Sequence, residues 1–138
     1  MVAIGDDRIM VFEGSQKPSL KKTIELDKEV DSVFYNERYI GVAYGNNDEK
    51  VTSHIKIYDY SGKMLMENDT GITYSKIGFD SNNEVCVIND VACEIYTIHG
   101  VKKFSYTFDK KLYEVMYKSG LNNYIFIYEG SMDEVRLK

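Results

Sequence analysis

Asp80, Asn82 and Glu84 place oxygen-bearing side chains at alternate positions near the middle of the chain. This spacing is typical of calcium-binding loops, in which carboxylate and amide oxygens surround the ion. Such a loop also needs a glycine at its sixth position and a later bidentate glutamate, but the sixth position here is Val85. We therefore expect an ordinary turn between two strands, and no metal site.

Hydrolytic chemistry would draw on the two histidines, His54 and His99, and Ser53, Ser61 and Asp59 lie close to His54 in the sequence. A Ser-His-Asp triad needs a serine on a strained turn and a base oriented by a carboxylate, and the chain has no Gly-x-Ser-x-Gly sequence. The 22 acidic residues single out no carboxylate pair for glycoside hydrolysis. The glycines are scattered and form no phosphate-binding loop. We predict no catalytic residue, no bound cofactor and no enzymatic activity.

Cys86 and Cys93 are the only cysteines. Even with His99 they would give a zinc ion only three ligands, and their spacing matches no redox motif. Both lie in apolar runs, which favours buried free thiols. If the turn between them is Asp90-Val91, Cys93 pairs with Ile88 and is only diagonal to Cys86. Diagonal neighbours lie roughly 7–8 Å apart, too far for a relaxed disulfide.

The composition excludes several classes of protein. With 138 residues, 43% of them hydrophobic, the chain is long and apolar enough for one packed domain. No uncharged stretch approaches the roughly 18 residues needed to cross a bilayer, and no basic segment precedes an apolar run, so we expect no secretory signal in this sequence. The 17 Lys and Arg against 22 Asp and Glu give a net charge of −5, which argues against a nucleic-acid partner.

Short runs rich in Val, Ile, Tyr and Phe predict an all-β fold. No window has the spacing of an amphipathic helix, and polar or glycine-containing segments separate the runs. Residues 104–108 alternate aromatic and polar side chains, as a strand with one buried face does. Gly62, Gly100 and Gly130 predict turns. The clearest runs are 8–12, 32–35, 39–44, 55–60 and 124–128.

One pattern, a β-branched residue followed two positions later by an aromatic residue, recurs about every 40 residues. It occurs at 32–35, 76–79 and 114–117, and a second and a third strand follow each time. In the first two cases a glycine turn leads to a fourth strand. Gly78 lies inside the first strand of its unit, where we expect a bulge or the close approach of a neighbouring sheet. Because residues 1–30 fit the same order from its second strand onward, we predict fourteen strands in groups of three, four, four and three.

Four-stranded units of about 40 residues have the length of β-propeller blades. Blades stack face to face, so inner strands should be buried on both sides, and the runs VCVI (85–88) and YIFIY (124–128) have this character. We predict four-stranded antiparallel blades of a partial β-propeller, about three and a half blades in all. Residues 1–138 would form a single domain with repeat units of about 1–30, 31–72, 73–111 and 112–138. A β-sandwich with accidental internal similarity is the alternative.

The ends of two predicted third strands carry a family resemblance. Residues 57–63 (IYDYSGK) and 95–103 (IYTIHGVKK) both run from a strand through a glycine turn to a lysine. In this they resemble blades of the WD-repeat and quinoprotein-like propeller superfamilies, although the chain lacks a Trp-Asp dipeptide, an opening Gly-His pair and a tryptophan docking motif. The chain is also similar to uncharacterised propeller-like domains of Gram-positive bacteria. Those are commonly carried behind an N-terminal membrane anchor, so the resemblance implies a bacterial, extracytoplasmic segment of a membrane-anchored parent protein.

Three surface features bear on contacts with other molecules. The pairs Lys21-Lys22, Lys102-Lys103 and Lys110-Lys111 fall on or beside outer strands, where lysines typically prevent edge-to-edge aggregation. The twelve tyrosines are expected mainly in the core between blades, and protein-binding faces are their alternative use. Residues 45–53 form a polar insertion, whose candidate interaction residues are Asn46, Asn47, Asp48, Glu49 and Lys50.

The function expected from these features is that of a non-enzymatic β-propeller module for protein–protein interaction or cell-envelope scaffolding. A ligand- or glycan-sensing propeller is the alternative, and an enzyme domain is a third possibility. A partial propeller leaves an apolar blade face open. We therefore expect a protein partner or self-association: the chain is the C-terminal part of a longer propeller, or it closes its ring with another copy. Light scattering that showed a compact monomer would contradict this.

Overall fold

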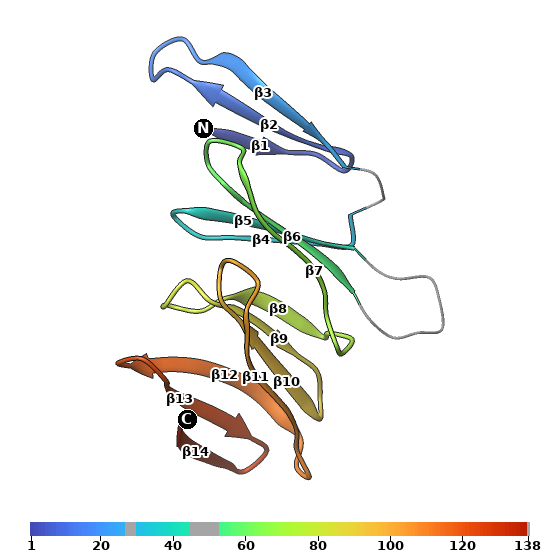
Figure 1. Cartoon of the computed structure of the whole chain (residues 1–138), viewed down its shortest axis with the longest axis vertical. Helices are drawn as coiled ribbons and strands as arrows, with labels where there is room; N and C mark the ends of the chain where they lie inside the picture. The colour runs from blue at the N-terminus through green and yellow to red at the C-terminus, as the bar shows by residue number, and fades with distance from the viewer. Residues whose placement is uncertain (27–29, 45–52, 138) are drawn as a thin grey trace.

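The computed structural model describes residues 1–26, 30–44 and 53–137. Within these residues the fold is all-β, with fourteen strands and no helix. The strands form four separate antiparallel sheets, which follow one another along the longest axis of the molecule (Figure 1). Sheets 1 to 4 hold three, four, four and three strands, which confirms the grouping predicted from the sequence.

Within each sheet the strands are neighbours in chain order, so every connection inside a sheet is a hairpin. Sheet 1 contains β1 (Val2–Ile4), β2 (Arg8–Glu13) and β3 (Ser19–Glu25); sheet 2 contains β4 (Ser32–Tyr35), β5 (Tyr39–Tyr44), β6 (His54–Asp59) and β7 (Met64–Asp69). Sheet 3 contains β8 (Lys76–Phe79), β9 (Val85–Ile88), β10 (Ala92–Tyr96) and β11 (Lys102–Thr107); sheet 4 contains β12 (Leu112–Ser119), β13 (Asn123–Tyr128) and β14 (Ser131–Arg136).

Three of the hairpins use the same five-residue turn, at 59–63, 80–84 and 97–101. In each, the N–H of the first residue donates to the carbonyl of the fifth, and the N–H of the fourth donates back to the carbonyl of the first. The fourth residue has a positive φ and is a glycine in two turns and Asn83 in the third. Asp80 Oδ1 accepts two backbone N–H groups inside its turn, each at 2.9 Å. The alternating oxygens at 80–84 thus belong to a strand-connecting turn, as predicted.

The apolar core is divided among the three interfaces between consecutive sheets. Because side chains alternate across a strand, each central strand supplies residues to two interfaces. Strands β9 and β10 are buried along their whole length. The buried residues are Ile9, Leu26, Ile40, Val42, Tyr44 and Tyr58 between sheets 1 and 2; Phe34, Ala43, Ile55, Ile57, Met66, Val85, Val87 and Tyr96 between sheets 2 and 3; and Cys86, Ile88, Cys93, Ile95, Leu112, Val115, Tyr124, Phe126 and Tyr128 between sheets 3 and 4.

The expectation that the YIFIY run is buried on both sides is wrong. In β13 the burial alternates: Tyr124 and Phe126 are buried against sheet 3, whereas Ile125 and Ile127 are only partly buried. The reason is that sheet 4 ends the stack, so no further sheet of the described chain covers its outer face (Figure 1).

The first strands of sheets 2, 3 and 4 lie toward one another along one edge of the stack. Strand β4 contacts β8, and β12 contacts β9. We call this side of the stack the inner edge. It brings together residues that are about 40 positions apart in the sequence, and it is where the candidate site is found.

Candidate binding site

The residues considered for hydrolytic chemistry are not brought together. Ser53 and His54 lie at one end of β6 and Asp59 and Ser61 at the other, separated by the length of the strand, about 17 Å at 3.3 Å per residue. His54 is held by acidic residues of the neighbouring strand instead, with Nδ1 2.7 Å from Asp69 Oδ1 and Nε2 also hydrogen-bonded to that strand. Ser61 Oγ donates to Asp59 Oδ1 at 2.6 Å, inside the turn.

The two cysteines are free and buried, as predicted. Cys93 pairs with Ile88 and Cys86 pairs with Ile95, which confirms that the two thiols are diagonal neighbours. Burial raises the pKa of the Cys93 thiol to about 12 and raises that of Cys86 well above its ordinary value. Both side chains are therefore protonated at neutral pH and are poor nucleophiles.

Lys102 and Lys103 lie on the edge strand β11, as predicted, and they have a further role. These neighbours on β11 point to opposite faces of sheet 3, and each binds a buried carboxylate. Lys102 Nζ lies 2.8 Å from Glu94 Oε2, and Glu94 is only 1% exposed. The lysines therefore do more than protect a sheet edge: they neutralise acidic groups that the core could not hold alone.

Glu94 is the centre of the network between sheets 2 and 3. Besides Lys102 it accepts hydrogen bonds from Tyr96 Oη at 2.8 Å and from the Gly71 N–H at 2.7 Å. Burial raises the pKa of the Glu94 carboxyl, but the hydrogen bonds that it accepts outweigh burial, so this pKa lies below its usual value. Burial, together with the bond to the carboxylate, raises the pKa of the Tyr96 hydroxyl, which stays a donor.

A second network of the same composition joins sheets 3 and 4. Glu84 accepts from Lys103 Nζ and from Tyr124 Oη, and Lys103 Nζ also lies 3.0 Å from Tyr124 Oη. Burial, with Glu84 as acceptor, raises the pKa of the Tyr124 hydroxyl. Sequence reasoning missed both networks, although a glutamate inside the apolar run Cys93-Glu94-Ile95 was a signal that a buried cation had to be nearby.

Gly78 does not have the environment predicted for it. The pairing of β8 with β9 is regular, so there is no bulge, and a Cβ added at Gly78 would have no atom within 4 Å. At Gly41 of sheet 2 the opposite holds: a Cβ there would lie 2.2 Å from the ring of Phe34. The close approach that was expected at Gly78 occurs at Gly41, and Gly78 faces open space.

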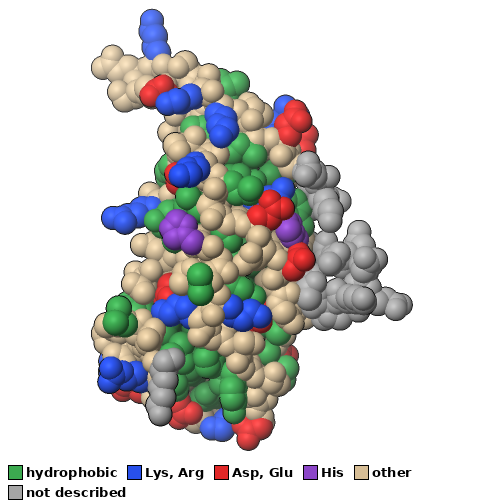
Figure 2. Space-filling model, in the orientation of Figure 1, with side chains coloured by type: hydrophobic (Ala, Val, Ile, Leu, Met, Phe, Trp, Pro, Cys, Tyr) green, Lys and Arg blue, Asp and Glu red, His purple; other side chains and the backbone are tan. Residues whose placement is uncertain are grey.

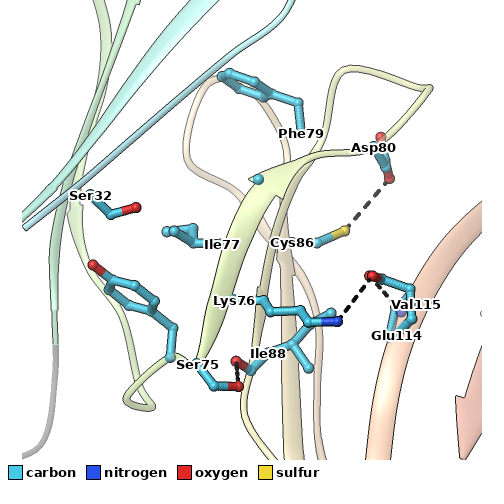
Figure 3. A pocket seen from close by; sticks show the side chains of 12 residues that line it. Ser32, Ser75, Lys76, Ile77, Phe79, Asp80, Cys86, Ile88, Glu114 and Val115 are labelled. Atoms are coloured by element: carbon cyan, nitrogen blue, oxygen red, sulfur yellow. Dashed lines mark hydrogen bonds and ion pairs between the residues drawn. The ribbon is translucent and has the colours of Figure 1, made fainter.

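This open space is part of a hollow of about 460 Å³ at the inner edge (Figure 3). Strand β8 runs along its middle; Ser32 and Tyr74 border it toward sheet 2, and Glu114 and Val115 border it toward sheet 4. Tyr74 Oη donates to Asp31 Oδ2 at 2.9 Å, and burial together with this bond raises the pKa of Tyr74 to about 12.

Two carboxylates and one lysine supply the charges of the hollow. Asp80 Oδ2 accepts from the Cys86 thiol at 3.8 Å, and Lys76 Nζ lies 3.6 Å from Glu114 Oε2 (Figure 3). Burial, with the nearby Glu84 carboxylate, raises the pKa of Asp80. The hollow therefore carries more negative than positive charge, in surroundings where an uncompensated carboxylate is unfavourable.

The tyrosines are divided between the core and the surface. Tyr44, Tyr96 and Tyr124 are fully buried, in agreement with their expected packing role. Tyr35 and Tyr60 are exposed and, with Val2, Ile4 and Ile40, line a hollow of about 330 Å³ between sheets 1 and 2. The candidate interaction residues Asn46, Asn47, Asp48, Glu49 and Lys50 lie outside the described residues.

Two features are absent from the described residues. No group of three or more His, Cys, Asp or Glu side chains is arranged there to hold a metal ion. No helix in that part of the chain has the length and apolar character needed to cross a membrane.

Comparison with known proteins places the chain in a family. No curated protein matches it. The model of DUF5711, described as a family of unknown function, matches residues 1–137. The chain therefore belongs to the DUF5711 family.

Proposed function

We propose that the chain is a non-enzymatic protein-interaction module, built as about three and a half blades of a β-propeller. The stack of antiparallel sheets, each in chain order, supports the propeller. The contact of β4 with β8 also supports it, because both are first strands of their sheets and the first strand of each propeller blade lines the central axis. A β-sandwich would instead pack two sheets face to face, whereas here four sheets follow one another.

The state of the chain's nucleophiles supports a non-enzymatic role. The cysteine pKa values are raised, so thiolates are scarce at neutral pH. Ser53 and Ser61 lie at opposite ends of β6, and the histidine next to Ser53 is bound by Asp69 and Glu67. A histidine engaged in this way is not oriented toward a serine hydroxyl.

The observation that carries the protein-binding role is the apolar face at each end of the stack. On sheet 4, Met116 pairs with Ile125 and Met132 pairs with Ile127, and all four side chains point away from the core; Met116 is 49% and Met132 69% exposed. On sheet 1, the outward face includes Met10 and the pair formed by Phe12 and Leu20. Figure 2 shows hydrophobic side chains reaching the surface between charged ones along the stack.

The partner proposed for the face of sheet 4 is sheet 1 of a second copy. In each sheet we call the face that points toward the following sheet the rear face, and the face that points toward the preceding sheet the front face. All three interfaces inside the chain join the rear face of one sheet to the front face of the next. The outer face of sheet 4 is a rear face and that of sheet 1 is a front face, so a head-to-tail contact repeats the internal arrangement. Such a contact buries apolar surface that would otherwise stay in water.

Light scattering on the purified chain tests this proposal. We expect a concentration-dependent dimer or larger assembly, and we expect the double variant Met116→Lys/Met132→Lys to be monomeric because lysines do not pack on an apolar face. The control is Met64→Lys on β7, whose side chain is 47% exposed but outside both end faces. A wild-type chain that stays monomeric and compact at every concentration would overturn the proposal.

A ligand- or glycan-sensing domain of a membrane-anchored bacterial protein is the second candidate function. The observation that favours it is the hollow at the inner edge, whose volume falls in the range of small-molecule sites. Isothermal titration with neutral oligosaccharides and with the charged probes described below distinguishes this candidate from protein binding alone.

A further inference from the structure

The hollow at the inner edge exists because one side chain is missing. In the repeat alignment Gly78 corresponds to Phe34 of β4 and Met116 of β12. The Phe34 ring fills the space beside Gly41 between sheets 2 and 3. Gly78 pairs with Cys86, which belongs to the next interface, so its missing side chain leaves the corresponding space between sheets 3 and 4 open.

The walls of this space combine an apolar surface with negative charge. Cys86, Ile88 and Val115 provide the apolar part. Asp80 provides a carboxylate whose Oδ1 is used by the turn, while Oδ2 accepts a weak bond from the Cys86 thiol. Glu114 provides the second carboxylate.

Lys76 neutralises only part of the negative charge of the hollow. Its side chain is 59% exposed and its Nζ donates to the Tyr113 carbonyl at 3.2 Å, which draws it toward the β12 rim beside Glu114. Lys76 begins β8 and Asp80 follows its last residue, so the two lie at opposite ends of this strand (Figure 3). An occupant with a cationic end and an apolar stem would complement both the charge and the walls, whereas an anion would meet two carboxylates.

We infer that the hollow over Gly78 receives a basic side chain, lysine or arginine, from a protein partner. The inference rests on the proposed protein-binding role and names the chemistry that the partner presents. The methylene stem lies against Ile88 and Val115, and the ammonium or guanidinium group binds Asp80 and Glu114 with charge-assisted hydrogen bonds. A neutral sugar would leave the Asp80 carboxylate without a counter-charge and Glu114 with Lys76 alone, so the basic side chain is favoured over a glycan.

The test is an NMR titration of the ¹⁵N-labelled chain with n-butylguanidinium and n-butylammonium, which carry only the end and stem of these side chains. We expect saturable shifts at the amides of Gly78, Asp80 and Val115. N-butylurea, which has the same stem without charge, should cause no saturable shift. The Gly78→Met variant should bind neither cation, because methionine, the residue at the corresponding position of β12, would fill the hollow.

Asp80→Asn tests the charge without removing the turn. The side chains of Asn36 and Asn89 already accept the N–H groups of their own turns through Oδ1, so asparagine is expected to hold the turn at 80–84 as well. We expect about tenfold weaker binding of n-butylguanidinium from the loss of one charge-assisted bond. The control, Glu25→Gln, removes one negative charge from an exposed position on β3 of sheet 1 and should leave binding unchanged.

The remaining outcomes overturn the inference. Equal binding of N-butylurea would show that charge is irrelevant, and unchanged binding by Gly78→Met would place the probe elsewhere. Shifts of the same amides by maltose, with none by the cations, would assign the hollow to a neutral sugar. No shift by any probe would also refute the basic side chain. None of these results affects the association of the end faces, because the hollow lies between sheets 3 and 4 and not at either end.

Discussion

Sheet 3 meets its two neighbours through interfaces that share a network of glutamate, lysine and tyrosine but differ in packing. Toward sheet 2, the carboxylate of Glu94 is bound by a lysine and a tyrosine, and the ring of Phe34 fills the inner edge. Toward sheet 4, Glu84 is likewise bound by a lysine and a tyrosine, but Gly78 leaves the inner edge open.

This difference separates what holds the sheets together from what leaves room for a ligand. A buried glutamate bound by a lysine and a tyrosine is present in both interfaces, so it is part of the structural connection between sheets. The filled or empty inner edge differs, and the difference comes from one residue position in the first strand. A hollow made in this way costs little stability as long as the polar networks on both sides of sheet 3 are intact.

The largest expected effect comes from removing either glutamate. Glu94→Ala and Glu84→Ala each leave a lysine and a tyrosine hydroxyl without their acceptor, which we expect to lower the free energy of unfolding by about 3 kcal/mol. Urea denaturation measures it. Glu67→Ala is the control: its partner is His54 on the surface of the β6–β7 ladder, and about 0.5 kcal/mol is expected. If the three variants lost the same stability, the networks would not be what connects the sheets.

The packing difference is tested by one substitution in each interface. Gly41→Ala places a methyl group where the Phe34 ring lies, and we expect a loss of about 2 kcal/mol from overpacking. Gly78→Ala meets open space, so its stability should stay within about 0.5 kcal/mol of the wild type. Thermal unfolding of the two variants measures both changes. A Gly78→Ala variant as unstable as Gly41→Ala would mean that the hollow is closed in solution.

The smallest expected effect concerns the pH dependence of the two interfaces. The pKa of Asp80 is raised above its ordinary 3.8, so its charged form destabilises the fold, and stability falls as pH rises from 3.8 through the folded-state pKa. Asp80→Asn removes this charge, and we expect it to be more stable than the wild type at neutral pH by less than about 1 kcal/mol. The gain should vanish below pH 3.8, where the wild-type carboxyl is protonated in both states.

The pKa of Glu94 is shifted in the opposite direction from that of Asp80, so its contribution to stability has the opposite pH dependence. Its pKa is lowered, so its contribution is present above the ordinary 4.5 and is lost as pH falls through the folded-state pKa. Glu94→Gln should therefore flatten the acid side of the stability profile, whereas Asp80→Asn should steepen it. Urea denaturation at a series of pH values between about 3 and 7 measures both profiles. Parallel profiles for the two variants would contradict this assignment of signs.

Local turn chemistry explains why much of the fold could be predicted from the sequence. The two-residue turn Asp90-Val91 determines the pairing of Cys93 with Ile88, because hairpin register follows from loop length. The grouping of fourteen strands followed in the same way from turn residues between apolar runs. The last strand does not follow the same pattern of faces: Ile95 of β10 faces sheet 4, the next sheet of the stack, whereas Val135 of β14 faces sheet 3, the previous one. A slip of one residue reverses the faces of a strand, and the strand pattern at 133–136 is too polar to specify its register.

The candidate site could not be predicted for a different reason. A glycine inside a strand can mark the close approach of a neighbouring side chain or an open space. Which of the two occurs depends on the distance to the neighbouring sheet, and the residues around the glycine do not determine this distance. Gly41 and Gly78 are both glycines in apolar strands, and they have opposite surroundings. The partners of Glu84 are similar in this respect, since Lys103 and Tyr124 lie 19 and 40 positions away from it in the sequence, and Tyr124 meets it only after the sheets stack.

The adjacency of Lys102 and Lys103 limits how the length of this chain can vary. Because neighbouring residues of a strand point to opposite faces, deleting or inserting one residue in the turn at 97–101 would exchange the two lysines between faces of sheet 3. One glutamate would then receive the other lysine, and the second would meet an apolar residue, Val101 or Phe104, so one change in the turn would alter both ion pairs. Substitutions in this turn can be absorbed one at a time, but a change in its length would disturb two interfaces together. We expect the spacing between β10 and β11 to be among the least variable lengths in the molecule.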